Sequence, residues 1–231
     1  MSLLLLIETA TTSCSVALAA NGGIIALREI NQRNVHAEVI TVYIDELFKE
    51  TGKHYHDLDA IAVSSGPGSY TGLRIGVSTA KGLCFSLDKP LIAVETLTAM
   101  AHGLIERGQV AINNNTLLCP MIDARRMEVY TAIFDHTGKQ VKPTAAEIID
   151  EHSFSDFLAS NKTIFFGDGA DKCRATLGHQ QNAIFSTEFS NSAKDMLVPA
   201  LAKLSAQQFE DIAYFEPYYL KDFIAGVKKK A

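Results

Sequence analysis

Two segments near the amino terminus carry residues whose types and spacing could bind a phosphate group. Glu8 and Thr9 close one apolar run, and Gly66, Gly68 and Ser69 follow a second. A carboxylate at the end of a strand can face a metal-bound phosphate, and glycines before a helix let an anion approach the backbone amides. These five residues are therefore candidates for binding a nucleotide.

Both segments also have a simpler structural interpretation. The glycine spacing departs from that of a dinucleotide-binding loop, because Thr71 stands at the third glycine position, and no Gly-Lys-Ser/Thr follows as in a P-loop. Gly66 and Gly68 fit a tight turn from strand to helix, and this role is favoured for them. Glu8 could instead hydrogen-bond the threonines after it, and a single carboxylate does not make a two-metal nuclease site.

Other residues able to do chemistry lie in the second half of the chain. Arg125 and Arg126 could grip a phosphate or a partner carboxylate, or could pair within their own turn. The turn 167–170, with the sequence GDGA, could hold an adenosine but is common in tight turns. The histidines at 36, 54 and 56 and the four cysteines show no recognised metal spacing, so no metal site is predicted.

The elements that must position these residues begin with a three-stranded antiparallel meander, in which Asn21-Gly22 is a typical hairpin turn. A helix and a strand–helix–strand unit with a parallel sheet follow. The predicted elements are strands at 3–8, 14–20 and 24–30, a helix at 36–50, a strand at 60–63, a helix at 72–87, a strand at 91–94 and a helix from 95 to 107.

The run 108–116, with its three consecutive asparagines, predicts a domain boundary. Beyond it the pattern is weaker. The predicted elements are strands at 117–122 and 128–135, helices at 144–151 and 156–160, a strand at 163–166, a helix at 194–209 and an extended segment at 213–220. Lys228 to Lys230 are expected to form a solubilising tail.

The helix at 36–50 has more apolar surface than one core requires. Its apolar residues span an arc of about 240° at roughly 100° per residue, so it should be covered on two sides. One side is expected to pack on the sheet. The other could meet a partner, together with the small residues of the helix at 72–87, or could be enclosed by the same chain.

Composition and charge exclude several classes of protein. The chain has 231 residues, of which 47% are hydrophobic, enough for one large core or two modest ones. The apolar run Leu3–Ile7 is too short for a signal peptide or a membrane span, so a cytoplasmic location is expected. The formal net charge of -5 argues against a chain that wraps nucleic acid by itself.

Three segments resemble the TsaB (YeaZ) family, which takes part in making threonylcarbamoyladenosine in tRNA. They are LLLIETATTSCSVAL at 4–18, SSGPGSYTGLRIGVSTAKGL at 64–83 and DARRMEVY at 123–130. The resemblance implies an α/β fold of the actin/Hsp70/sugar-kinase (ASKHA) type, with two ribonuclease-H-like halves of mixed sheets flanked by helices. It divides the chain into 1–107 and a smaller, degenerate half at 108–231, whose last helix could pack back on the first half.

The family resemblance implies a non-catalytic scaffold that binds the catalytic subunit TsaD, with a small ATPase, TsaE, joining them. The chain alone would self-associate as a homodimer, tRNA would be reached only through the complex, and ATP and magnesium only through partner subunits. In this family the two helices at 36–50 and 72–87 form the subunit contact. The implied interface residues are Val39, Ile40, Tyr43, Leu47, Arg74, Ser78 and Lys81.

The resemblance also implies that this chain is not an enzyme. Aligned with TsaD through the shared KPLI stretch, Glu95, Thr96 and Met100 stand where the catalytic relative has an asparagine and two metal-binding histidines. Threonine is a poor ligand and a thioether suits only soft metals. The alternative is a nucleotide-dependent kinase or ATPase of the same fold, which titration with Mg-ATP would distinguish.

Overall fold

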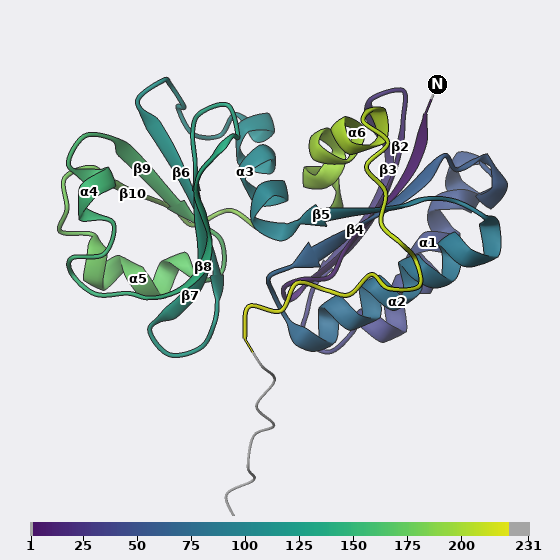
Figure 1. Cartoon of the computed structure of the whole chain (residues 1–231), viewed down its shortest axis with the longest axis horizontal. Helices are drawn as coiled ribbons and strands as arrows, with labels where there is room; N and C mark the ends of the chain where they lie inside the picture. Colours follow the sequence, from purple (N-terminus) through teal and green to yellow (C-terminus); the bar gives the residue numbers. More distant parts are fainter. Residues whose placement is uncertain (1, 222–231) are drawn as a thin grey trace, which may run out of the picture.

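The structure is a computed structural model in which residues 2–221 are described, so the predicted lysine tail at 228–230 lies outside the described residues. Figure 1 shows two α/β halves side by side, each built on one sheet with helices against it. Each sheet has five strands and mixes parallel with antiparallel pairs, which confirms the predicted fold class. No helix among residues 2–221 is both long and apolar enough to cross a membrane.

The first sheet has the strand order β3-β2-β1-β4-β5. Its first three strands form the predicted antiparallel meander, whereas β4 and β5 run parallel to β1. The carboxyl ends of β1, β4 and β5 therefore meet at one edge of the sheet. The strands are β1 (Leu3–Glu8), β2 (Ser13–Ala20), β3 (Gly23–Asn31), β4 (Ala60–Gly66) and β5 (Leu91–Glu95).

Two helices, α1 (His36–Thr51) and α2 (Tyr70–Leu87), cover one face of this sheet. α1 ends at Gly52, whose left-handed backbone (φ 64°) costs a glycine nothing. α2 begins after Ser69, whose hydroxyl accepts a hydrogen bond from an amide of the first helical turn at 3.2 Å. The short helix η1 (Tyr55–Asp57) lies between them in the sequence.

The opposite face of the first sheet is covered by a late part of the chain, the short helix η2 (Ala193–Met196) and α6 (Leu197–Ser205). Helix α3 (Thr96–Arg107) lies between the halves and contributes to the cores of both. It is joined to η2 by a buried ion pair at 2.6 Å between Arg107 and Asp195. The predicted helix at 194–209 is thus two shorter pieces that end at residue 205.

The second sheet has the order β10-β9-β6-β7-β8. The helix predicted at 144–151 is wrong, because this segment belongs to edge strand β8, where Ala146 pairs with Tyr130. Ladder pairing here overrides the helical preference of alanine. The elements are β6 (Thr116–Asp123), β7 (Glu128–Phe134), β8 (Gln140–Ile148), α4 (Ser155–Leu158), β9 (Lys162–Phe166), α5 (Ala170–Leu177) and β10 (Ala183–Ser186).

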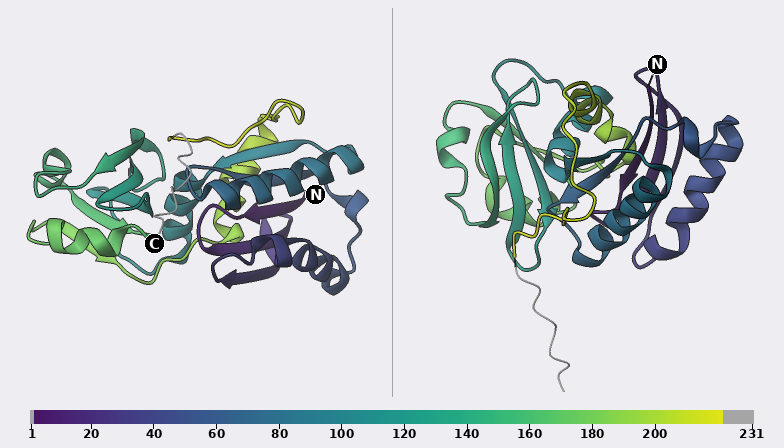
Figure 2. Two further views of the ribbon diagram at one scale, coloured as in Figure 1. Left: turned by 90° about the horizontal axis from the view of Figure 1, so that it is seen from below. Right: turned by 45° about the vertical axis from the view of Figure 1, so that its right-hand side comes forward.

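After α6, residues 206–221 form an extended segment that we call the C-terminal strap. It first pairs with the edge of β5, where the amide of Glu210 donates to the carbonyl of Leu91 at 2.9 Å. It then runs alongside α2, as both views in Figure 2 show. It reaches the second half at an ion pair between Lys221 and Glu128. The segment predicted to be extended at 213–220 is not a regular helix, but it starts in a turn at 212–214, which the amide of Phe215 closes by donating to the carbonyl of Asp211 at 2.8 Å.

Candidate functional site

The carboxyl ends of β1 and β4 bring the predicted nucleotide-binding residues of both segments to one edge of the first sheet. The amide of Ala10 donates to Glu8 Oε1 at 2.5 Å, and the amide of Thr9 donates to Ser64 Oγ at 3.2 Å. Glu8 and Thr9 are both buried. The Glu8 carboxyl and the Thr9 amide are therefore engaged with the turn that follows β1 and with the end of β4, whereas the buried hydroxyl of Thr9 has no hydrogen-bond partner among the described residues.

The glycines after β4 leave space that the backbone of the turn after β1 occupies. A Cβ atom at Gly68 would overlap the carbonyl oxygen of Ala10, and one at Gly72 would overlap the carbonyl oxygen of Thr9. One at Gly76 would meet the hydroxyl of Thr9. The space beside these glycines is filled by the protein itself, so they have the packing role that the sequence favoured.

Gly66 and Ser69 are occupied in a similar way. The backbone of Gly66 has φ 110°, and a Cβ atom there would lie 2.7 Å from the carbonyl oxygen of Tyr218 in the C-terminal strap. The amide of Ser69 donates to the carbonyl of Ala10 at 2.6 Å, and its hydroxyl caps α2. The corner after β4 thus binds two other segments of the same chain.

Burial also changes the chemistry of Glu8. Its side chain is removed from water, and this raises the pKa of Glu8 to about 7, although hydrogen bonds from Ala10 and Ser64 act in the opposite direction. One of its oxygens already accepts from the amide of Ala10, and its side chain is buried. This geometry favours the structural role of Glu8, as a partner of the turn after β1, over a ligand for a magnesium–phosphate group.

The positions aligned with the histidines of the catalytic relative do not fit a metal either. Thr96 begins α3, and Met100 follows one turn later; both are buried. Met100 packs in the core of the second half against Gly167, where it fills space. Across residues 2–221, no three His, Cys, Asp or Glu side chains gather closely enough to hold a metal ion.

Arg125 and Arg126 lie in the exposed turn between β6 and β7. Both have a left-handed backbone, with φ 69° and 47°, which costs a non-glycine residue energy. Their guanidinium groups form no ion pair with the described residues. The acidic residues beside this turn form ion pairs with lysines. Asp123 pairs with Lys172, and Glu128 pairs with Lys221 of the strap.

The turn 167–170 packs against the carboxyl end of β6, where the β6–β7 hairpin begins. Asp168 Oδ1 accepts a hydrogen bond from the amide of Asp123 at 3.0 Å, and Gly169 lies against the backbone of Ile122. Burial raises the pKa of Asp168 above its ordinary value. The geometry thus gives this turn the structural role that its sequence favoured, as a support for the end of β6.

Helix α1 presents less of its apolar arc than the sequence predicts. Ile40 and Leu47 are only 2% and 0% exposed, because they pack in the core above the first sheet. Their predicted place in a partner interface is therefore wrong. Val39 and Tyr43 are half-buried against the same core, and the exposed apolar residue of this helix is Val42.

Helix α2 has an outer face of small and polar residues. Arg74 and Ser78 are exposed there, as predicted for interface residues. Lys81 is different, because its ammonium group donates to the carbonyls of Ala213 and Phe215 in the strap, at 3.3 and 3.0 Å. Lys81 is thus held by its own chain but remains partly exposed, so its place in a partner interface stays a prediction.

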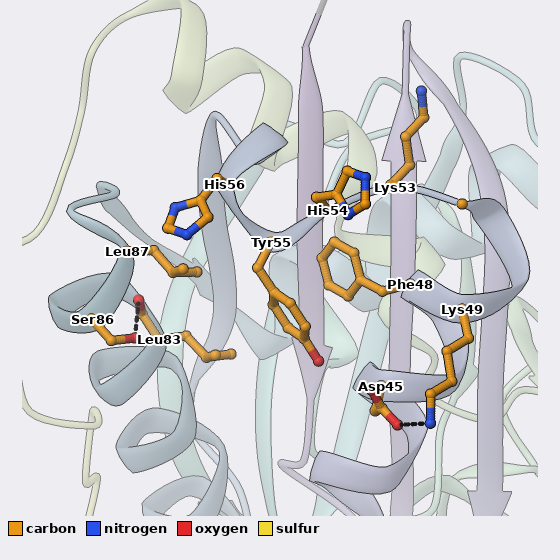
Figure 3. Close-up of a pocket in the computed structure, with 11 residues that line it drawn as sticks. Asp45, Phe48, Lys49, Lys53, His54, Tyr55, His56, Leu83, Ser86 and Leu87 are labelled. Carbon is orange, nitrogen blue, oxygen red and sulfur yellow. Dashed lines mark hydrogen bonds and ion pairs between the residues drawn. The ribbon is translucent and has the colours of Figure 1, made fainter.

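Two shallow hollows follow the seam between α1 and α2. The larger, of about 710 Å³, is drawn in Figure 3, where Tyr55 lies between Phe48 of α1 and Leu83 of α2. The rings of Phe48 and Tyr55 stack at 4.1 Å. The other hollow, of about 500 Å³, is lined by Thr41 and Ser78 among others. Such grooves between helices can accept side chains of a partner.

One prominent exposed residue of this face, Phe85, is absent from the predicted interface. It continues the exposed line of Arg74, Ser78 and Gly82 along α2 at helical spacing. That spacing is visible in the sequence, but the predicted surface of this helix rested on its small residues. The face is therefore more apolar than predicted at the carboxyl end of the helix.

The two mixed sheets, each with a meander leading into parallel strands, define a protein of the actin/Hsp70/sugar-kinase class. A family model described as "TsaD: tRNA N6-adenosine threonylcarbamoyltransferase" matches residues 6–228. A protein of Escherichia coli, named tRNA threonylcarbamoyladenosine biosynthesis protein TsaB, is 30% identical over 237 residues, 97% of each chain. This chain belongs to the TsaB (YeaZ) family, within the wider family that the TsaD model describes.

Further relatives agree with this assignment. The TsaB protein of Haemophilus influenzae is 41% identical over 127 residues, which are 55% of this chain and 51% of that protein. A solved structure, "YeaZ from Pseudomonas aeruginosa", is 25% identical, covers 95% of this chain and 100% of that chain, and has a TM-score of 0.81. The tRNA N6-adenosine threonylcarbamoyltransferase of Bacillus subtilis is 42% identical over 87 residues, 37% of this chain and 24% of that enzyme.

Proposed function

We propose that this chain is a non-catalytic subunit in the synthesis of threonylcarbamoyladenosine at adenosine 37 of tRNAs that read codons beginning with A. It acts by binding a catalytic subunit of the TsaD type and holding it in a competent arrangement. The names of the relatives that match most of the chain support the pathway. The similarity to threonylcarbamoyltransferases supports a partner of that class.

The observation that carries the non-catalytic role is the pair Thr96 and Met100. Both side chains are buried, and Met100 packs against a glycine of the second half. A hydroxyl and a thioether are unsuited to a metal that polarises an activated carbamoyl group. The filled glycine corner supports the same conclusion, because nucleotide chemistry would then belong to partner subunits.

The proposed arrangement places the exposed seam of α1 and α2 against the catalytic subunit. The seam carries Val42, Ser78 and Phe85, which lie outside the core of this chain and would be removed from water in the complex. A TsaE-type ATPase joins the pair, and the isolated chain forms a homodimer through the same seam. tRNA, ATP and magnesium reach the chain only through these partners, in the cytoplasm.

Reconstitution of the tRNA modification tests this function. Catalytic subunit, ATPase, tRNA and threonylcarbamoyl-adenylate are incubated with and without this chain, and modified adenosine is measured by mass spectrometry. We expect modification only when the chain is present, and none from the chain alone. Equal modification without it, or turnover by the chain unaided, would overturn the proposal.

Calorimetric titration of the isolated chain with Mg-ATP separates this function from a nucleotide-dependent kinase or ATPase. A scaffold whose glycine corner is filled gives no binding heat. Tight binding together with ATP turnover would favour the enzyme and contradict the scaffold.

A further inference from the structure

Two aromatic side chains are exposed on the same side of the first half. Phe85 of α2 is 84% exposed, and Tyr214 of the C-terminal strap is 85% exposed. These are the largest exposed fractions among the large hydrophobic residues that the structure describes. Aromatic residues are enriched where proteins bind one another and carry much of the binding energy there.

The strap holds Tyr214 at a fixed place beside α2. The two residues on either side of it, Ala213 and Phe215, accept hydrogen bonds from Lys81 through their carbonyl groups. The amides of Ala213 and Tyr214 are held by Asp211 Oδ1, at 2.8 and 3.3 Å. The backbone of Tyr214 is therefore fixed by its own chain while its ring remains exposed, which lowers the entropy cost of binding.

The strap is also anchored further along its length. Ile212 and Phe215 pack against the core above the first sheet. The amide of Tyr218 donates to the carbonyl of Ser65 at 2.7 Å, and the ring of Tyr219 lies 5.0 Å from that of Tyr70. In Figure 2 the strap, α2 and α1 lie in this order across one side of the first half.

The surface of α2 differs on the two sides of Phe85. At about 100° per residue, Lys81 and the exposed Arg74 lie on the side that faces the strap, whereas Ser78, Gly82 and Ser86 lie on the other side. Gly82 is exposed, and a Cβ atom there would meet nothing within 4 Å, so this chain does not need a glycine at that position. Aromatic residues and arginine are both enriched where proteins bind one another.

We propose that the C-terminal strap forms one side of the docking surface for the catalytic subunit, with Phe85 and Tyr214 as its aromatic anchors. The proposal rests on the proposed function and widens the contact from the α1–α2 seam to the strap. Threonylcarbamoyltransferases share sequence with this chain, with 42% identity over 87 residues for that of Bacillus subtilis, so we expect such a subunit to present a comparable apolar surface. A second copy of this chain is the competing occupant.

The test uses the full chain with a TsaD-type catalytic subunit. Phe85→Ala and Tyr214→Ala are each titrated against that subunit by calorimetry, alongside Ile148→Ala as a matched control. Ile148 is 77% exposed but lies on edge strand β8 of the second half. We expect each anchor variant to weaken the complex about 30-fold and the control to leave affinity unchanged.

Thermal unfolding of the three variants accompanies the titration, and unchanged midpoints show that the exposed side chains do not support the fold. Gly82→Arg adds a second probe, because it has room in the free chain but blocks close approach of a partner. It is expected to weaken the complex more than either alanine variant.

The outcomes separate this inference from the function on which it rests. Anchor variants that bind the catalytic subunit like wild type, while Ser78→Arg does not, would overturn the role of the strap and leave the scaffold function standing. Anchor variants that weaken self-association alone would assign the surface to a second copy and overturn the proposed occupant. No binding by the wild-type chain would contradict the proposed function itself.

Discussion

Helix α2 presents glycines on two sides, and the two sets differ in what surrounds them. On the inner side, Gly72 and Gly76 receive the backbone and hydroxyl of Thr9, and a Cβ atom at either would overlap them. On the outer side, Gly82 has open space around it. The inner glycines are required by the fold of this chain, whereas the outer one has no function within it.

This difference shows how one stretch of sequence can serve two purposes. The glycine corner resembles a phosphate cradle, yet in this protein it closes the first half upon itself through Thr9, Ala10 and the strap. The outer face, which attracts less notice in the sequence, remains exposed. Small residues therefore mark a site only where the surrounding structure leaves them without a neighbour.

The largest effect is expected for Gly72→Ala, which tests the inner side. The added methyl group overlaps the carbonyl oxygen of Thr9, a backbone atom that cannot move without shifting β1. We expect a loss of about 3 kcal/mol or more in the free energy of unfolding. Urea denaturation measures it, and a variant as stable as wild type would break the comparison.

The variant Glu8→Gln tests the same inner region through the pH dependence of the free energy of unfolding. The folded pKa of Glu8, about 7, lies above its ordinary value of 4.5, so between these values the folded state keeps a proton that the unfolded chain has lost. The free energy of unfolding therefore falls as pH rises through this window and levels off above it. Glutamine does not titrate and removes this fall.

We expect Glu8→Gln to exceed wild type by roughly 2 to 3 kcal/mol at pH 8 and to approach it near pH 4.5. Because all other groups titrate in both proteins, the difference between the two urea-denaturation profiles isolates Glu8. A difference that does not change with pH would show that this carboxyl is not buried in its neutral form.

Ser78→Arg probes the outer side through binding. A long cationic side chain at this small residue would be desolvated in the complex and would block close approach, so we expect association with the catalytic subunit to weaken by about 2 kcal/mol. Stability should stay within about 0.5 kcal/mol of wild type, because Ser78 is exposed. Calorimetry measures the affinity, and Ser160→Arg, at an exposed serine of the second half, is the control.

The smallest effect is expected for Gly82→Ala. Alanine stabilises a helix interior by about 0.5 to 1 kcal/mol relative to glycine, and nothing obstructs its methyl group here. Thermal unfolding should therefore show a slightly higher midpoint than wild type. A loss comparable to that of Gly72→Ala would mean that the two sides of α2 do not differ.

The first half was predictable because its strands and helices carry clear periodicity and its turns carry clear signals, such as Asn21-Gly22. Strand β8 was not, because an exposed edge strand rich in alanine and glutamate looks helical and is fixed by pairing with β7. The predicted interface on α1 included two residues, Ile40 and Leu47, that the core encloses, and the predicted contact Lys81 is hydrogen-bonded to the strap. Local sequence cannot show which distant segment will cover a face.

The route of the chain through the two halves sets the timing of its folding on the ribosome. Leu4 and Leu6 of β1 are made before the second half of the chain, but Ala193 and Met196, which cover them, are made after it. During synthesis, one apolar face of the first sheet must therefore remain exposed to solvent until the whole second half has been made. Chains that stop early would retain that open side and become substrates for chaperones or aggregation.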